Sequence, residues 1–159
     1  MRVYCVNGDE ITEFLNNFNK IEVSYESFSG GIYNGFDIFS PIDLDEPKCK
    51  FIFAADEENI LGVIKFKRYK MRNHDYLSEE EFKTYKTGIK NYKGIMFVDV
   101  KDDYRRNGIA KEMIKYLCDI TKAEGPKTGF RLGKLTPLGK KANLISIFKT
   151  YLPNGDIKL

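Results

Sequence analysis

The segment from Val98 to Ala110 constrains the fold of this chain more than any other part of it. An apolar, β-branched run ends at Val100, charged residues follow, and an amphipathic pattern begins at Ile109. This order predicts a strand that leads through a short loop into the N-terminus of a helix. The first turn of a helix carries backbone N–H groups without helical partners and a partial positive charge. The sequence therefore predicts an anion site suited to phosphate or pyrophosphate.

The residues of the predicted loop fit such a ligand. Gly108 has no Cβ, so the backbone can approach a ligand closely, and Ala110 is nearly as small. Arg105 and Arg106 supply charge-assisted donors for phosphate oxygens. The alternative is an ordinary basic turn, since short patterns of this kind also occur by chance.

The order Arg105-x-x-Gly108-x-Ala110, after a strand ending at Val100, resembles the acetyl-coenzyme A loop of the Gcn5-related N-acetyltransferases, the GNAT family. Arg106 stands where that family often has glycine, and Ala110 replaces the commoner glycine. In the family, this loop holds the cofactor pyrophosphate and the preceding strand pairs with the pantetheine arm. The resemblance implies the following cofactor-binding residues: Val98, Val100, Arg105, Arg106, Asn107, Gly108, Ile109, Ala110 and Asn143.

The same resemblance suggests catalytic residues. The family's usual acid is a tyrosine on the last helix, but Phe148 occupies that position here. Tyr151, one turn later, is the candidate proton donor, and its alternative is a core or surface aromatic. Asp99 is the candidate general base, because a carboxylate on a buried strand has a functional or an ion-pairing reason to be there. Pairing with a nearby Lys or Arg is the equal alternative.

Composition limits the class of protein. A chain of 159 residues suits a single domain, residues 1–159, with one core. No apolar run is long enough to span a bilayer, and the N-terminus lacks the features of a secretory signal, so no membrane association is expected. Three cysteines without paired spacing indicate reduced thiols in the cytoplasm. The single histidine, His74, favours a surface position and no metal site.

Charge is distributed unevenly along the chain. Residues 1–100 hold 13 Lys and Arg against 17 Asp and Glu, a net of −4. Residues 101–159 hold 13 against 6, a net of +7. The basic part begins where the predicted phosphate loop begins, and its field would attract coenzyme A or nucleic acid. A basic surface without a specific partner is the third interpretation.

Hydrophobic periodicity predicts the order of the elements. Residues 24–47 read as a long loop whose aromatic residues line an acceptor pocket or belong to the core. Ser78 and Glu81 form a capping box. The expected strands are 2–6, 49–55, 60–66, 94–100 and 130–135. Strand 94–100 is apolar on both faces and so is expected to be buried on both, with Asp99 the exception. The expected helices are 9–20, 78–87, 107–123 and a last one from Pro137 to before Pro153.

These elements predict an α/β, layered α+β domain. Their order resembles the GNAT fold, and this resemblance implies a GNAT-like mixed, mostly antiparallel central sheet flanked by helices on both faces. The resemblance implies an N-acetyltransferase that moves an acetyl group from acetyl-CoA to a primary amine by direct transfer in a ternary complex. The amine acceptor is a small molecule, a protein or an aminoacyl-tRNA, and pairing of an edge strand would make a homodimer. Two other classes stay open, a non-catalytic acyl-CoA-binding or regulatory protein of the same fold and a nucleic-acid-binding protein.

Overall fold

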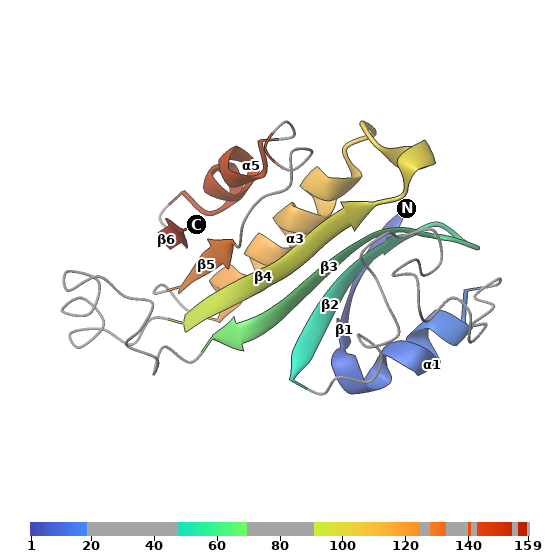
Figure 1. The fold of residues 1–159 in the computed structure, drawn as a ribbon. Helices are drawn as coiled ribbons and strands as arrows, with labels where there is room; N and C mark the ends of the chain where they lie inside the picture. Colours follow the sequence, from blue (N-terminus) through green and yellow to red (C-terminus); the bar gives the residue numbers. More distant parts are fainter. Residues whose placement is uncertain are drawn as a thin grey trace.

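The computed structural model describes residues 1–18, 48–69, 91–124, 128–132, 140, 143–153 and 156–158. They form one six-stranded sheet, in the order β1-β2-β3-β4-β5-β6, and three α-helices (Figure 1). The strands are β1 (Arg2–Asn7), β2 (Cys49–Ala55), β3 (Ile60–Tyr69), β4 (Asn91–Val100), β5 (Thr128–Leu132) and β6 (Asp156–Lys158). The helices are α1 (Ile11–Asn16), α3 (Ile109–Ala123) and α5 (Leu144–Tyr151), with 3-10 turns η1 (Gly8–Glu10) and η5 (Asp102–Tyr104).

The sheet is mixed. Strands β1 to β4 pair antiparallel in chain order, whereas β4 with β5 and β5 with β6 pair parallel. The parallel pairing of β4 and β5 requires a crossover, which α3 provides. This arrangement confirms the expected layered fold with a mixed, mostly antiparallel sheet.

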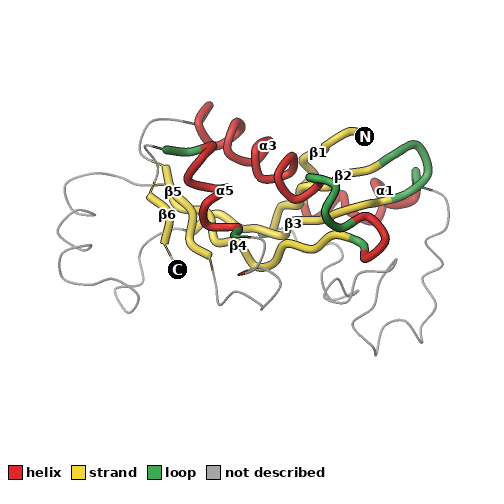
Figure 2. The backbone as a smooth tube through the Cα atoms, turned by 90° about the horizontal axis from the view of Figure 1, so that it is seen from above, coloured by secondary structure: helices red, strands yellow, loops and turns green. Residues whose placement is uncertain are grey.

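Alternation along the strands gives the sheet two apolar faces. In β2, Ile52 and Ala54 belong to the core cluster that contains the buried sides of α3 and α5, whereas Phe51 and Phe53 belong to the cluster under α1. We call these the α3 face and the α1 face. Helices α3 and α5 lie side by side over the first of them (Figure 2). Helices therefore cover both faces of the sheet, as the sequence predicts.

A tight turn fixes the β2–β3 hairpin. One carboxylate oxygen of Asp56 accepts hydrogen bonds from the backbone N–H of Glu58 (2.9 Å) and of Asn59 (2.6 Å). These two bonds hold the pKa of Asp56 below its ordinary value, and the bond from Glu58 has the larger effect. The turn sets the register that brings β3 against β4.

Helix α3 packs closely on β3 because Gly62 has no side chain. A Cβ at Gly62 would lie 2.7 Å from Met113 Cε and 3.1 Å from Ile109 Cγ2. Ile109 and Met113 are both buried, so a side chain at position 62 would require the flexible end of Met113 to move and Ile109 to shift slightly. Gly62 therefore allows α3 to pack close to β3 at this point.

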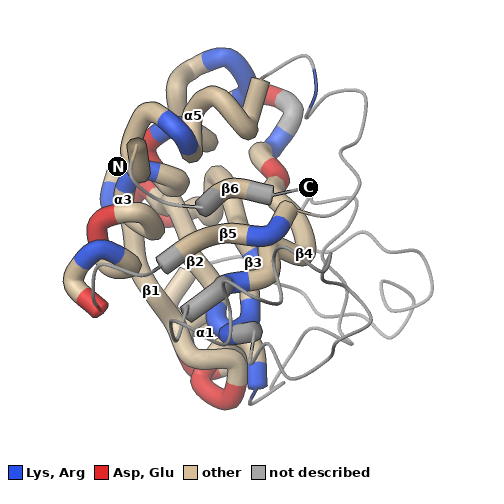
Figure 3. Tube along the Cα trace, turned by 90° about the vertical axis from the view of Figure 1, so that its left-hand side faces the viewer, with Lys and Arg blue, Asp and Glu red and all other residues tan. Residues whose placement is uncertain are grey.

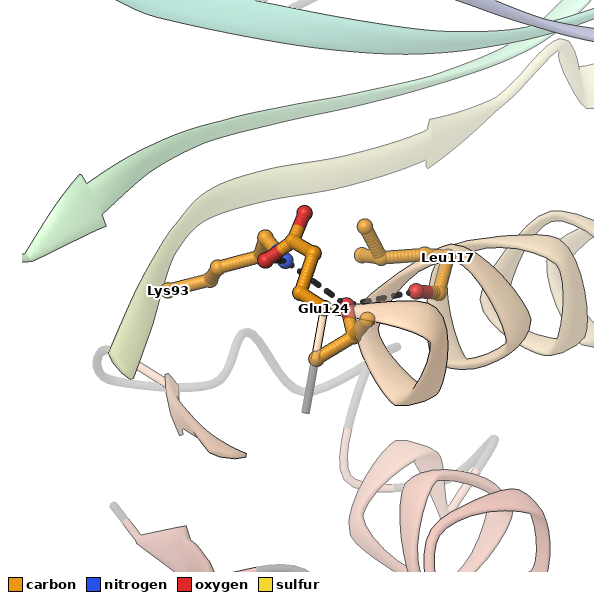
Figure 4. A network of polar contacts seen from close by, with 4 residues as sticks. Lys93, Leu117 and Glu124 are labelled. Carbon is orange, nitrogen blue, oxygen red and sulfur yellow. Dashed lines mark hydrogen bonds and ion pairs between the residues drawn. The ribbon is translucent and has the colours of Figure 1, made fainter. Parts of the chain in front are cut away.

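A polar network anchors the other end of α3 to β4 (Figure 4). Lys93 is 5% exposed, and its Nζ donates to Thr121 Oγ1 (2.9 Å) and pairs with Glu124 Oε2 (2.7 Å). The Thr121 hydroxyl donates in turn to the carbonyl of Leu117 (2.7 Å). The buried cation lies at the C-terminal end of α3, where the helix dipole favours positive charge.

The observed elements differ from the expected ones in several places. Helix α1 is shorter than residues 9–20, β4 starts before residue 94, β5 starts before residue 130, and β6 was not expected. The expected burial of both faces of β4, from which Asp99 was excepted, is wrong for its second half, because Met96 is 48% exposed and Phe97 and Val98 are half-buried. The predictions for residues 24–47 and for a capped helix at 78–87 lie outside the described residues. No helix in the described ranges is both long and apolar enough to cross a membrane.

Candidate cofactor and catalytic site

Among the described strands, none pairs with the second half of β4 on the side away from β3, and we call this side its open edge. Strand β5 pairs with β4 only from Asn91 to Ile95, and no described strand continues along that side of β4. Met96 is an extra residue, because Ile95 lies opposite Phe66 and Phe97 lies opposite Lys65. Such a bulge bends its strand. Beyond it, β4 extends past the tip of β5 (Figure 1).

The peptide groups of Val98 and Val100 point to this open edge. The N–H of Lys101 donates to Leu61 O at 2.9 Å, so the odd-numbered residues at this end of β4 direct their backbone groups to β3. In an antiparallel pair the residues between them direct theirs the other way. An extended ligand with amide groups can pair with such an edge as an added strand does.

The loop after β4 is shaped as an anion site. Arg106 (φ 67°) and Gly108 (φ 76°) both have left-handed backbone conformations on either side of Asn107. Turns of this kind gather backbone N–H groups around a concavity. Arg106, Asn107 and Gly108 are exposed, and a Cβ at Gly108 would meet no heavy atom within 4 Å. Asn107 Nδ2 donates to Tyr104 O (3.2 Å), which closes the loop on itself.

Helix α3 begins directly after this loop. Its first intrahelical bond runs from the N–H of Glu112 to Gly108 O (3.0 Å), and no side chain at Gly108 caps the helix. The N–H groups of Ile109, Ala110 and Lys111 precede that bond and belong to the first turn. The side chain of Ile109 is buried and that of Ala110 is half-buried, so both anchor the loop to the core. The backbone N–H groups of these two residues lie at the N-terminal end of α3.

Arg105 and Asp99 form an ion pair at the end of β4. Arg105 Nη2 lies 3.2 Å from Asp99 Oδ1, and Arg105 Nε donates to Val100 O at 2.9 Å. Asp99 Oδ1 also accepts the backbone N–H of Val100 at 3.0 Å. The structure thus contains the pairing that the sequence offered as the alternative to a catalytic base. Arg105 is turned back on β4, whereas Arg106 is the exposed arginine of the loop.

The thiols of this chain are poorly suited to a nucleophilic role. Cys49 and Cys118 are buried, and Cys5 is exposed on the edge strand β1. Burial raises the pKa of Cys118 to about 12, and partial desolvation raises the pKa of Cys5 although its side chain reaches the surface. Thiols with raised pKa values stay protonated near neutral pH and react slowly. No group of His, Cys, Asp and Glu that could hold a metal lies among the residues that the structure describes.

Residues 15–132 match the model described as the acetyltransferase (GNAT) family. The chain belongs to the GNAT family. The matched range includes the open edge of β4, the loop and all of α3, so the resemblance carried by Arg105, Gly108 and Ala110 is confirmed at the level of the family.

Solved structures of other acetyltransferases share the fold of this GNAT protein. A ribosomal-protein-alanine N-acetyltransferase from Brucella melitensis biovar Abortus 2308 is 17% identical, with a TM-score of 0.53 over 92% of this chain and 89% of the other. An aminoglycoside acetyltransferase from an uncultured soil metagenomic sample is 13% identical, with a TM-score of 0.57 over 98% and 89%. A possible acetyltransferase from Clostridium difficile 630 is 17% identical, with a TM-score of 0.51 over 92% and 88%. No curated protein matches the sequence.

The two remaining predicted site residues of this GNAT protein, Asn143 and Tyr151, lie at opposite ends of helix α5. Asn143 precedes the helix in a left-handed conformation (φ 54°), is exposed, and makes no side-chain cap. Tyr151 is the last residue of the helix, roughly 12 Å further along its axis, and is half-buried against the core cluster. Phe148 is fully buried, with its ring 4.9 Å from that of Phe130. The structure therefore does not bring Tyr151 and Asn143 together.

Two features of the site were missed in the sequence. The bulge at Met96 gives no periodic signal, since Gly94 to Val98 reads as an uninterrupted apolar run. Lys65 occupies a position that alternation would assign to solvent, yet it is 4% exposed on the α1 face, with Nζ 6.0 Å from the Phe51 ring centroid. It lies opposite Phe97 of β4. In the sequence, the only indication of this buried cation was a lysine inside an otherwise apolar strand.

Proposed function

We propose that this GNAT protein is an N-acetyltransferase that moves an acetyl group from acetyl-CoA to a primary amine by direct transfer in a ternary complex. One observation carries the proposal, the continuous path from the open edge of β4 at Val98, through the loop at Arg106–Gly108, to the first turn of α3. A strand edge, an anion-binding concavity and a helix N-terminus follow one another along this path. They match an extended amide-containing arm joined to a pyrophosphate.

Each part of the path has its own task in this proposal. The first-turn N–H groups of α3, the loop backbone and the Arg106 guanidinium would hold the pyrophosphate, and the exposed side chain of Asn143 is available to the arm. The peptide of Val98 would pair with the arm and donate a hydrogen bond toward the acyl carbonyl. A preorganised backbone N–H of this kind stabilises developing negative charge. The bound thioester supplies the activated acyl group.

The acceptor amine must arrive uncharged and close to the acyl carbon. Holding two reactants at near-attack distance can contribute roughly 7–11 kcal/mol, so positioning alone explains much of the expected rate. Direct transfer is supported by the thiols, since Cys49 and Cys118 are buried and the pKa values of Cys5 and Cys118 are raised. The three cysteines form no disulfide, which fits our proposal of a cytoplasmic location.

Neither the acceptor nor the catalytic acid follows from the relatives. The similar structures named above act, by their names, on a ribosomal protein and on aminoglycosides, and identities of 13–17% transfer neither substrate to this chain. Tyr151 stays a prediction as proton donor, although its place at the far end of α5 from Asn143 weighs against it. Solvent water is the simplest remaining donor to the leaving thiolate.

A second candidate function is acyl-CoA binding without catalysis. Burial of Phe148 against Phe130, at the position where the family resemblance expects the acid, is the observation that favours it. Binding of acetyl-CoA without release of free CoA in the presence of varied amines would support this candidate. Release of free CoA together with acetylation of one amine would support the transferase.

The cofactor site can be tested by calorimetric titration with acetyl-CoA. We expect micromolar binding by the wild type and none by Gly108→Glu, which places bulk and negative charge where the pyrophosphate would lie. Gly108→Ala is the matched control, because it shares the backbone strain of a left-handed residue but adds only a methyl group into open space. A folded wild type that does not bind acetyl-CoA would overturn the proposed function.

A further inference from the structure

Met96 is a large apolar side chain that stays in contact with solvent. It is 48% exposed, and Met1 is the other exposed large hydrophobic residue in the part of the chain that the structure describes. Met96 is the extra residue of the β4 bulge and follows Ile95, the last residue of β4 that pairs with β5. Bulges are common next to active sites, where they redirect a side chain. Met96 therefore lies where the open edge of β4 begins.

The side chain of Met96 lies along the α1 face of the sheet. Its Sδ accepts a contact of 3.9 Å from the thiol of Cys49, a buried residue of β2 in the cluster on the α1 face. Cys49 lies opposite Lys67 of β3, and Lys67 lies opposite Gly94 of β4. The Met96 side chain therefore extends from β4 across β3 to β2.

In the proposed function, the acceptor reaches the acyl group from the α1 face. The pyrophosphate would lie at the N-terminus of α3, and α3 and α5 cover the opposite face of the sheet (Figure 2). The side chain of Val98 packs against the core cluster on that face, whereas Phe97 packs against the cluster on the α1 face. An amine that approaches an acyl group held by the Val98 peptide therefore passes Phe97 and Met96.

Two lysines of β3 lie on either side of the bulge on the α1 face. Lys65 is 4% exposed and lies opposite Phe97, and Lys67, two residues further along β3, is exposed. The one carboxylate of β4, Asp99, forms an ion pair with Arg105. Like charges repel, so this pattern opposes an acceptor with several ammonium groups and favours one whose remaining surface is apolar.

We propose that Met96 is a specificity-determining residue, and that the acceptor is a monoamine whose apolar body packs on Met96 and Phe97. This inference rests on the proposed function, because it names the acceptor class of the same site. Methionine suits the task, since its side chain is adaptable and its polarisable sulfur contacts aromatic rings favourably. In the transfer, the amine nitrogen forms a bond to the acyl carbon and the bond from that carbon to the CoA sulfur breaks. The proton lost by the nitrogen ends on the CoA thiol.

The test measures release of free CoA with three amines: 2-phenylethylamine, ethanolamine and the polyamine spermidine. We expect the wild type to have a kcat/KM for 2-phenylethylamine about tenfold above those for the other two, because of the added apolar contact. Met96→Ala should lower the preference over ethanolamine about fivefold, mainly through the KM for 2-phenylethylamine. Met96→Leu, the matched control, keeps an apolar side chain of similar size and should retain most of the preference. Met96→Gln keeps the length but is polar, so it should behave like Met96→Ala.

Three results would overturn the proposal. They are an unchanged preference in folded Met96→Ala and Met96→Gln, a kcat/KM for spermidine above that for 2-phenylethylamine, and acetylation of a protein or an aminoacyl-tRNA but of no small amine. If Met96→Ala does not fold, Met96→Gln and Met96→Leu provide the same comparison.

Calorimetry with acetyl-CoA distinguishes these results from a failure of the proposed function. A folded wild type that does not bind acetyl-CoA would overturn the proposed function itself. So would a wild type that binds acetyl-CoA but releases no CoA with any of these acceptors.

Discussion

Arg106 combines an unfavourable backbone conformation with an exposed charge, and these two properties can be separated. Its φ of 67° costs a non-glycine residue roughly 1–2 kcal/mol, and glycine would avoid that cost while losing about 0.5–1 kcal/mol through its greater freedom in the unfolded chain. We therefore expect Arg106→Gly to leave stability nearly unchanged. We expect it to weaken acetyl-CoA binding about fivefold, near 1 kcal/mol, through the lost charge.

Two further variants at this position serve as controls. Arg106→Asn tolerates the left-handed conformation but carries no charge, so it should bind as weakly as Arg106→Gly. Arg106→Lys should keep most of the affinity. Calorimetry together with urea unfolding measures both quantities. Wild-type affinity in Arg106→Gly would show that this arginine does not contact the phosphates.

Cys118 makes stability depend on pH in the alkaline range. Its pKa is raised to about 12 in the folded protein, mainly by burial, from an ordinary value of 9.0. Below pH 9 the thiol is protonated in both states and contributes no pH dependence. Between pH 9 and 12 the unfolded thiol ionises and the folded one does not, so stability should fall by up to about 1.4 kcal/mol per pH unit. Above pH 12 the loss should level off.

The comparison with Cys118→Ala isolates this contribution from the other groups that titrate at high pH. The variant should be less stable at pH 7, because a buried sulfur is lost, but its stability should fall less steeply above pH 9. Urea unfolding at pH 7, 9 and 10 provides the measurement. Parallel pH profiles for the two proteins would contradict the prediction.

Among single residues, those of the loop were predictable and their partners were not. Gly108, Ala110 and the two arginines were found from their types and spacing between a strand and a helix. The different contacts of Arg105 and Arg106 could not be predicted, because they depend on the backbone angles of the turn. Two interpretations of Asp99 were open in the sequence, and the contact with Arg105 is a three-dimensional fact.

The packing of α3 against β4 depends on the polar network around Lys93. Removing one partner of a buried ion pair leaves the other charge buried and unpaired. Replacing the buried cation itself by an apolar residue of similar size leaves no buried charge. We expect Glu124→Ala to destabilise the protein by about 1 kcal/mol, a value kept small because Glu124 is 43% exposed. We expect Lys93→Met to cost less, since Thr121 keeps its bond to Leu117.

The same variants can be combined to check that the network is the cause. In the Lys93→Met background, Glu124→Ala should have almost no further effect on the free energy of unfolding. Urea unfolding of the four proteins measures this. Equal costs of Glu124→Ala in both backgrounds would contradict the prediction and assign Glu124 a role independent of Lys93.

At the scale of elements, long periodic segments were predicted well and sheet edges poorly. Helix α3 and the β2–β3 hairpin follow from apolar spacing and turn residues, and both are present. Strand β6 has three residues, too few for any period to appear in the sequence. The early start of β4 at Asn91 is stabilised by parallel pairing with β5, a tertiary effect that local sequence does not record.

At the scale of the whole molecule, the Lys and Arg residues that the structure describes do not gather on a single element. Lys and Arg are spread over α3, α5 and strands such as β3 and β5, and acidic residues lie between them on α3 (Figure 3). Within 101–159 the net charge is +7, but the whole chain carries only +3. This pattern favours attraction of a small, highly charged ligand at the loop over tight binding of a long nucleic acid.

The two kinds of partner respond differently to salt, so ionic strength provides the test. Screening lengths fall from roughly 10 Å at 0.1 M to about 3 Å at 1 M, so the affinity for acetyl-CoA should fall several-fold over that range. A ligand without the 3′-phosphate, dephospho-CoA, should show a shallower dependence, and so should Arg106→Gly with acetyl-CoA. Calorimetry at three salt concentrations measures each slope. Salt-independent binding would contradict a phosphate site at the loop, and competition between acetyl-CoA and a short duplex DNA at 0.15 M salt would favour the nucleic-acid interpretation instead.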